Sequence, residues 1–169
     1  LTGMMPSGKS TVGKYLARLL GAPFFDLDRV ITAKEHRSIT AIFRQDGEER
    51  FRDLELGALK ATLRDHPHAV IATGGGTMCR QESWDALPKE AVVVWLNLPV
   101  EILAERVGDG AHRPMLTGAP SKRGILEELL KERECWYTKA HVALETQDLE
   151  PNQVAQGILA SLEAISRPA

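Results

Sequence analysis

The chain has 169 residues, a formal net charge of −2, 43% hydrophobic residues and 26% charged residues. This length corresponds to one domain that can bury its own core, and the charge excludes a broad cationic surface for nucleic acid or membrane. No apolar run approaches the ~20 residues of a membrane-spanning helix. Cys79 and Cys135 form neither a disulfide framework nor a zinc pattern, so we expect reduced thiols in a cytoplasmic protein. Nothing suggests an obligate dimer, and we expect a monomer.

The segment from Gly3 to Thr11 reads GMMPSGKST and fits the phosphate-binding pattern G-x-x-x-x-G-K-[ST], the P-loop. In this pattern, backbone N–H groups converge on one point and the following helix contributes the positive end of its dipole. The lysine reaches the outer phosphates, and the serine hydroxyl joins the coordination shell of Mg²⁺. We therefore predict that a nucleoside triphosphate binds to a loop made of Gly3, Pro6, Ser7, Gly8, Lys9, Ser10 and Thr11.

Two features of this loop are unusual. Pro6 has no N–H group, so the loop has one fewer donor for phosphate and we expect weakened nucleotide binding. Only Leu1 and Thr2 precede the loop, although a P-loop normally follows a buried central strand. If the chain starts here, we expect the sheet to lack most of one strand and to lose stability.

Short apolar runs alternate with helical patterns along the chain, which is typical of a parallel α/β sheet. Besides a remnant strand at 1–2, the expected strands cover 23–25, 69–72, 91–96 and 142–144. The expected helices cover 9–20, 38–45, 48–64, 81–87, 100–107, 122–137 and 151–165. The run at 91–96 has no polar alternation and should be covered on both faces. Asp46-Gly47 predicts a turn between two of the helices.

Two carboxylates, Asp26 and Asp28, follow the second expected strand. The carboxyl ends of parallel strands line the binding crevice, and in an extended segment both side chains would point the same way. One carboxylate could then hold Mg²⁺ through water while the other meets the substrate. Alternatively, Asp28 is the N-cap of a helix.

Arg52 and Glu55 are i, i+3 neighbours on an expected helix. Spacing alone favours a surface ion pair worth ~0–1 kcal/mol. The functional alternative is an arginine, oriented by a carboxylate, that binds an acidic substrate through its planar fork. Arg133 is either a second such anchor or a salt-bridge partner in a Glu-rich helix.

Two glycine-rich segments stand out, one after the strand expected at 69–72 and one after the helix expected at 100–107. Gly74 to Gly76 allow a ligand to approach the backbone closely, although a flexible turn would have the same composition. The irregular segment 108–120 contains three Gly and two Pro. Such segments are usually functional lids or disordered; we favour a lid, because Arg113 in its middle could close onto the phosphates.

Taken in order, these motifs resemble the shikimate kinase family over almost the whole chain. The order is P-loop, D-x-D, F-R-x-x-E, G-G-G, R-P and R-x-x-x-Y, here at Gly3–Thr11, Asp26/Asp28, Phe51–Glu55, Gly74–Gly76, Arg113-Pro114 and Arg133–Tyr137. The stretch from Ser38 to Glu55 also resembles that family. The P-loop alone fits very many proteins, whereas the ordered set is specific.

The resemblance implies a fold and a reaction. The fold is a single P-loop kinase domain over 1–169, with three layers and a five-stranded parallel sheet of order 2-3-1-4-5. A helical segment at about 29–64 binds substrate, and a mobile lid lies at about 108–120. The reaction is ATP-dependent, Mg²⁺-assisted phosphorylation of the 3-hydroxyl of shikimate, in the pathway to chorismate and the aromatic amino acids.

The resemblance also implies roles for single residues. Catalysis would rest on Lys9, Asp28 and Arg113, and Mg²⁺ on Ser10 and Asp26. The shikimate carboxylate would lie between Arg52 and Arg133, with Glu55 orienting Arg52 and Gly74, Gly75 and Gly76 bringing backbone against the substrate. Arg106 and Pro151 fall where the family contacts adenine. Departures from the family pattern are Pro6, His36, Cys135 and Trp136.

Two other functions stay open. A kinase for another small acidic polyol, such as gluconate, would also need arginines for a carboxylate, although the D-x-D and F-R-x-x-E motifs favour shikimate. A nucleotide-binding module without turnover is the second alternative, because Pro6 or the short first strand could impair the loop.

Overall fold

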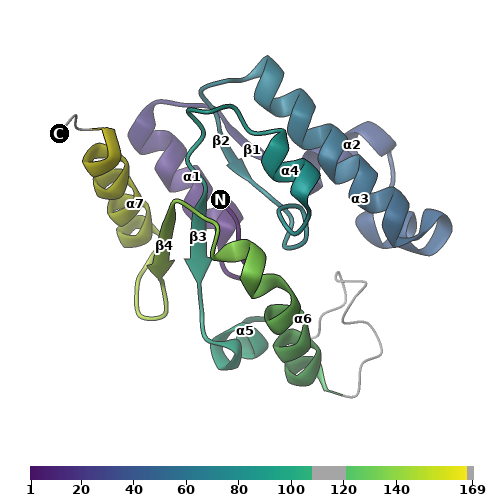
Figure 1. The fold of residues 1–169 in the computed structure, drawn as a ribbon. Helices are drawn as coiled ribbons and strands as arrows, with labels where there is room; N and C mark the ends of the chain where they lie inside the picture. Colours follow the sequence, from purple (N-terminus) through teal and green to yellow (C-terminus); the bar gives the residue numbers. More distant parts are fainter. Residues whose placement is uncertain (108–120, 167–169) are drawn as a thin grey trace.

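The computed structural model describes residues 1–107 and 121–166, in which strands and helices alternate (Figure 1). The elements are α1 (Lys9–Leu20), β1 (Phe24–Asp26), α2 (Leu27–Glu35), α3 (Ile39–Asp65), β2 (Val70–Ala72), α4 (Gln81–Asp85), β3 (Val94–Asn97), α5 (Val100–Val107), α6 (Lys122–Tyr137), β4 (Val142–Glu145) and α7 (Pro151–Ser166). The predicted α/β alternation is confirmed. The predicted lid at 108–120 lies outside the described residues.

The strands form two parallel pairs, β1 with β2 and β3 with β4. Leu1 and Thr2 lie between the two pairs. The Thr2 N–H donates to the Val94 carbonyl at 2.8 Å, and the Thr73 N–H donates to the Leu1 carbonyl at 3.0 Å. The remnant strand expected at 1–2 is therefore an isolated bridge to Trp95 on one side, with hydrogen bonds to the end of β2 on the other.

Alternate strand residues pack against helices on opposite faces. Val70, Val94 and Leu96 contact a buried cluster of α1 and α7, which includes Leu16 and Ile158. Their neighbours along the chain belong to other clusters: Ile71 and Val93 pack with Leu59 of α3, whereas Trp95 packs with Leu126 of α6. Helices thus cover both faces of β3, as its apolar run predicts.

Helix α3 changes direction at Gly47, where φ is 84° and ψ is 171°. The predicted turn at Asp46-Gly47 is confirmed as a break inside one long element. The helix begins at the N-cap Ser38, whose hydroxyl accepts from the Ala41 N–H at 3.1 Å. Beyond the break, Phe51 packs with Ile31 of α2 and Ile42 in a small buried cluster.

Helix α2 begins at Leu27, before the helical segment expected at about 29–64, and this start corrects the interpretation of the two aspartates. Asp26 is the last residue of β1 and also the N-cap of α2, accepting from the Arg29 N–H at 3.3 Å. Asp28 lies in the first helical turn. The segment is therefore not extended through both residues, and Asp26 rather than Asp28 is the cap.

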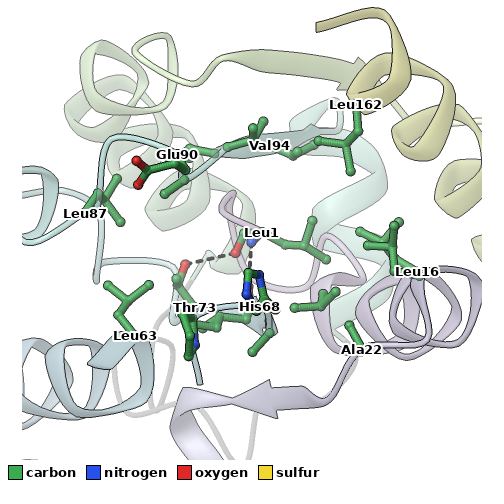
Figure 2. Close-up of a pocket in the computed structure, with 18 of the residues that line it drawn as sticks. Leu1, Leu16, Ala22, Leu63, His68, Thr73, Leu87, Glu90, Val94 and Leu162 are labelled. Atoms are coloured by element: carbon green, nitrogen blue, oxygen red, sulfur yellow. Dashed lines mark hydrogen bonds between the residues drawn. The ribbon is translucent and has the colours of Figure 1, made fainter. Parts of the chain in front are cut away.

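A cavity of about 750 Å³ lies beside Leu1, between the helices of the two faces. Its lining is mainly apolar and includes Leu16, Leu63, Val94 and Leu162 (Figure 2). None of the P-loop residues from Gly3 to Lys9 lines it. No helix in the described ranges, 1–107 and 121–166, is long and apolar enough to cross a membrane.

Candidate functional site

The P-loop runs from the Leu1–Thr2 segment into α1. Gly8 is the N-cap of α1 in a left-handed conformation, with φ 89° and ψ 11°, and the Met5–Pro6 peptide bond is cis. Having no side chain, Gly8 leaves the amino end of the helix uncovered, the arrangement that binds phosphate groups. Lys9, Ser10 and Thr11 form the first turn, where the helix dipole is positive at its end.

The Lys9 ammonium group lies over this loop and is largely buried. It donates to the carbonyls of Gly3 at 2.8 Å and Met4 at 3.0 Å, and to the Ser7 hydroxyl at 3.4 Å. These contacts hold a positive charge against the loop that would bind the phosphates.

The predicted magnesium ligands lie together at the head of α1. The Ser10 hydroxyl donates to the Asp26 carboxylate, across 16 residues of sequence. Mg²⁺ usually binds through one or two such oxygens plus phosphates rather than in a cage of protein ligands. This pair fits the ion.

Arg52 and Glu55 form a buried ion pair rather than a surface pair. Arg52 Nη1 donates to Glu55 Oε2 at 2.6 Å, and the Glu55 side chain is only 2% exposed. The other Glu55 oxygen accepts from the Thr77 hydroxyl at 2.5 Å. Burial alone would lower the pKa of Arg52, but the charges and hydrogen bonds of Glu55 and Glu48 raise it above its ordinary value. Arg52 therefore stays cationic at any working pH.

The three glycines after β2 bring backbone against the charged side chains. A Cβ atom on Gly74 would lie 2.2 Å from Glu55 Oε1 and 3.3 Å from Asp28 Oδ1. A Cβ atom on Gly76 would lie 2.5 Å from Arg52 Nη1. In the structure, the groups that lie against this turn are the protein's own carboxylates and guanidinium. The close approach of a ligand to these glycines stays a prediction.

Gly75 connects this cluster to the P-loop. A Cβ atom there would lie 3.4 Å from Arg133 Nη1, 3.5 Å from the Met5 nitrogen and 3.6 Å from the Gly3 oxygen. Its carbonyl accepts from the Tyr137 hydroxyl at 2.5 Å. The phosphate loop and the arginine cluster therefore meet at one glycine turn.

Arg133 is buried on α6, one turn before Tyr137. Burial raises the pKa of Tyr137 above its ordinary value. Burial also raises the pKa of Cys79 to about 11, with Arg133 opposing the shift. Both groups stay protonated at neutral pH, so Arg133 is the charged member of this trio.

A cavity of about 310 Å³ lies where α3, the glycine turn and α6 meet. Its lining comprises Glu48, Arg52, Gly76, Cys79, Arg80, Glu132, Arg133 and Trp136. Three arginines, Arg52, Arg80 and Arg133, line this small cavity. Guanidinium groups at one cavity favour an acidic ligand with a planar carboxylate.

Two predicted site residues, Arg106 and Pro151, are not among the residues that line or contact this cluster. Arg106 is exposed in the last turn of α5, and Pro151 is the first residue of α7, which packs along α1. Arg113 lies outside the described residues. Conversely, sequence reasoning missed Thr77, Tyr137 and Glu48 as contacts of the cluster. Tyr137 and Glu48 stand inside the motifs at 133–137 and 38–55, the only signal that could have pointed to them.

The phosphate loop at the head of α1, joined to an arginine-lined cavity, defines the class: a P-loop kinase that acts on a small molecule. A family model described as "Shikimate kinase" matches residues 5–163. The chain belongs to the shikimate kinase family.

Individual relatives agree over nearly the full length. A shikimate kinase from Thermosynechococcus vestitus is 40% identical over 169 residues, which are 99% of this chain and 91% of the relative. The solved structure "Shikimate kinase from Acinetobacter baumannii in complex with shikimate" superposes with a TM-score of 0.93 at 34% identity, covering 99% of this chain and 93% of that one. The shikimate kinase from Aquifex aeolicus superposes at 0.83 with 36% identity, covering 98% and 95%.

Proposed function

We propose that this chain transfers the γ-phosphoryl group of ATP to the 3-hydroxyl of shikimate. The observation that carries the proposal is the position of Gly75, where an added Cβ atom would lie 3.4 to 3.6 Å from both Arg133 and the P-loop. A phosphate bound at the loop and an acid bound in the cavity would therefore be neighbours. Family membership and the shikimate complex of the Acinetobacter relative support the choice of acceptor.

The nucleotide half of the site is Gly3, Pro6, Ser7, Gly8, Lys9, Ser10 and Thr11. Lys9 holds the β- and γ-phosphates, and Ser10 with Asp26 holds the metal ion. When bound, Mg²⁺ neutralises charge on the phosphates. On the family resemblance, we assign adenine contacts to Arg106 and Pro151. On the same ground, we propose that the positive charge of Arg113 stabilises the transferred phosphoryl group.

In the acceptor half, Arg52 and Arg133 bind the carboxylate of shikimate. Glu55 fixes Arg52, and the turn Gly74–Gly76 supports the ring from the backbone side. Asp28 reaches this turn from α2 and orients, or deprotonates, the attacking hydroxyl. Catalysis then depends on positioning and electrostatics, with in-line transfer between two fixed partners.

We also propose that the strands form one parallel sheet, in the spatial order β1, β2, Leu1–Thr2, β3, β4. When Leu1–Thr2 is counted as the first of five strands in the sequence, this is the order 2-3-1-4-5. The hydrogen bonds of Leu1 and Thr2 to both strand pairs support this order. The sheet belongs to a single domain over 1–169, in which residues 29–64 bind the acceptor and residues 108–120 serve as the lid. We expect a cytoplasmic monomer.

The test is ADP release from MgATP with shikimate, gluconate, quinate or no acceptor. Release with shikimate alone is the expected result. Release with gluconate instead would assign another acidic polyol, and no release by a folded protein that binds ATP would leave a binding module.

Arg52→Lys tests the acceptor half separately. A point charge cannot replace a planar fork, so we expect the KM for shikimate to rise at least about tenfold, since charge-assisted hydrogen bonds contribute ~1.5–3 kcal/mol. The KM for ATP should change little. Equal losses for both substrates would make Arg52 a structural residue.

A further inference from the structure

The guanidinium group of Arg52 is held against the glycine turn. A Cβ atom on Gly76 would be almost equidistant from Nη1, Cζ and Nη2, at 2.5, 2.6 and 2.8 Å. The backbone of Gly76 therefore faces the flat side of the group. The rings of Phe43 and Phe51 also lie near it, with centroids 5.9 and 5.6 Å from Cζ.

Two glutamates occupy the edges of this fixed group. Nη1 donates to Glu55 at 2.6 Å, whereas Nε and Nη2 both donate to Glu48 Oε1, at 3.2 and 2.7 Å. A carboxylate ligand binds arginine through two such neighbouring N–H groups. Glu48 thus holds the edge that an incoming acid would use.

The two glutamates differ in how firmly they are held. The Glu55 side chain is 2% exposed and also bonds Thr77, so it cannot leave without uncovering a buried charge. The Glu48 side chain is 53% exposed, lines the cavity and lies directly after the break at Gly47. It can turn outward into water at little cost.

We propose that Glu48 is an internal competitor for Arg52, which the substrate carboxylate displaces on binding. This inference rests on the proposed function, because it assigns the Nε–Nη2 edge to the acceptor acid. Glu48 then lowers acceptor affinity and keeps Arg52 aligned until the acceptor arrives. It is a residue that tunes affinity and selects for acids able to displace a carboxylate.

The test compares Glu48→Gln with Glu132→Gln. Both residues are exposed and line the same cavity, and both changes remove one negative charge. We expect E48Q to lower the KM and the Kd for shikimate about two- to fivefold, the range of a partly exposed ion pair. The KM for ATP should stay near the wild-type value, and E132Q should have a clearly smaller effect on shikimate.

An unchanged or higher shikimate KM and Kd in E48Q would overturn the competition and make Glu48 a supporting partner of Arg52. Equal decreases of the shikimate Kd in E48Q and E132Q would mean that Glu48 acts only through general repulsion of anions. Kd values are measured by calorimetry with shikimate and with cyclohex-1-enecarboxylate, which has no hydroxyl to phosphorylate. If the wild type binds shikimate without phosphorylating it, the proposed function fails, while the ratio of Kd values between wild type and E48Q still decides the role of Glu48. Failure of both proteins to bind either acid overturns the competition as well.

Discussion

Each glycine of the turn after β2 lies against a different charged group. Gly74 faces Glu55 and Asp28, Gly75 faces Arg133, and Gly76 faces the guanidinium of Arg52. The turn therefore works as a template that sets the spacing of the cluster. Because Arg52 and Glu55 are both part of one ion pair, a shift of the backbone at one glycine would move several charges together.

Gly76→Ala should damage acceptor binding more than Gly75→Ala. The added methyl group at Gly76 would overlap Arg52 at 2.5 Å, whereas at Gly75 its nearest atoms are at 3.4 to 3.6 Å, ordinary contact distances. Misplacing a binding group by about 1 Å can cost ~10²-fold in rate, so we expect kcat/KM for shikimate to fall ten- to a hundredfold in the first variant. Steady-state kinetics on both variants checks this. Equal decreases of kcat/KM for shikimate in both variants would contradict the idea that the glycine turn sets the spacing of the cluster.

The residue types of the cluster were predictable, but its burial was not. Spacing alone favoured a solvated pair for Arg52 and Glu55, whereas the structure buries Glu55 under Gly74 and Thr77. Those partners stand 19 and 22 residues further along the chain, so no local pattern contains them. The F-R-x-x-E and G-G-G motifs of the family place these residues in one site. The ordered set of motifs thus carries information on long-range packing that the spacing of residues within one helix does not.

At the scale of elements, the break in α3 sets the direction of the helical segment that carries the residues proposed to bind the acceptor. Glu48, Arg52 and Glu55 follow Gly47 at i+1, i+5 and i+8, and the helix after the break presents all three to the glycine turn. Arg37 supports the first half, because it pairs with Asp46 at 2.6 Å and Glu35 at 3.1 Å. This pairing lowers the pKa of Asp46, through its hydrogen bond to Arg37.

Two glycines of α3 offer a matched pair of substitutions. A Cβ atom would meet open space at both Gly47 and Gly57, so the outcome depends on backbone conformation alone. At Gly47, φ 84° with ψ 171° is accessible essentially to glycine only, and Gly47→Ala should destabilise by ~1–3 kcal/mol. Gly57→Ala, inside the regular helix, should stabilise by ~0.5–1 kcal/mol. Urea unfolding of both variants measures the change in the free energy of unfolding. A change of the same sign at both positions would contradict the assignment of the break to Gly47.

Most elements were predictable because their apolar spacing is regular, as in α1, α6 and α7. Apolar spacing did not predict helix α2, although the family resemblance implied a helical segment from about residue 29. Its start was placed too late because the helix follows β1 with no intervening turn: Asp26 ends the strand and is also the N-cap. The strand predicted at 91–96 begins only at Val94. Val92 and Val93 precede it as apolar core residues without a regular strand partner, and apolar runs predict burial better than pairing.

For the whole molecule, the proposed single sheet depends on two residues. Leu1 and Thr2 connect the strand pairs through main-chain hydrogen bonds, and the cavity of about 750 Å³ opens directly beside Leu1 (Figure 2). Along a strand, successive residues direct their main-chain N–H groups to opposite neighbouring strands. The N–H groups of Ile71 and Val94 therefore point toward the line on which Leu1 and Thr2 lie. That line, flanked by β2 and β3 and lined by apolar side chains, has the shape and chemistry to accept an extended apolar strand.

In a polypeptide that begins at Leu1, the terminal ammonium group is buried and donates to the Ile71 carbonyl at 2.6 Å. Burial, with a smaller contribution from the charge of Lys9, lowers the pKa of this group to about 5 from its ordinary value of 8.0. The unfolded chain therefore binds a proton between these values that the folded chain does not bind. The free energy of unfolding should rise with pH across this window and level off above pH 8.

Adding Val-Ile-Val-Ile before Leu1 should stabilise the molecule and remove this pH dependence. The added residues would continue the central strand into the cavity, and the terminal charge would be replaced by a neutral amide that still donates to Ile71. Burial of the new side chains, less the cost of ordering them, should contribute about 1–4 kcal/mol. The control is an added Ser-Gly-Ser-Gly, which also removes the terminal charge but buries no apolar surface. Chemical unfolding at pH 5.5 and pH 8.5 separates the two effects: both extensions should flatten the pH dependence, and only the apolar one should raise stability at pH 8.5. Equal stability of the two extended proteins at pH 8.5 would mean that the cavity does not accept a strand.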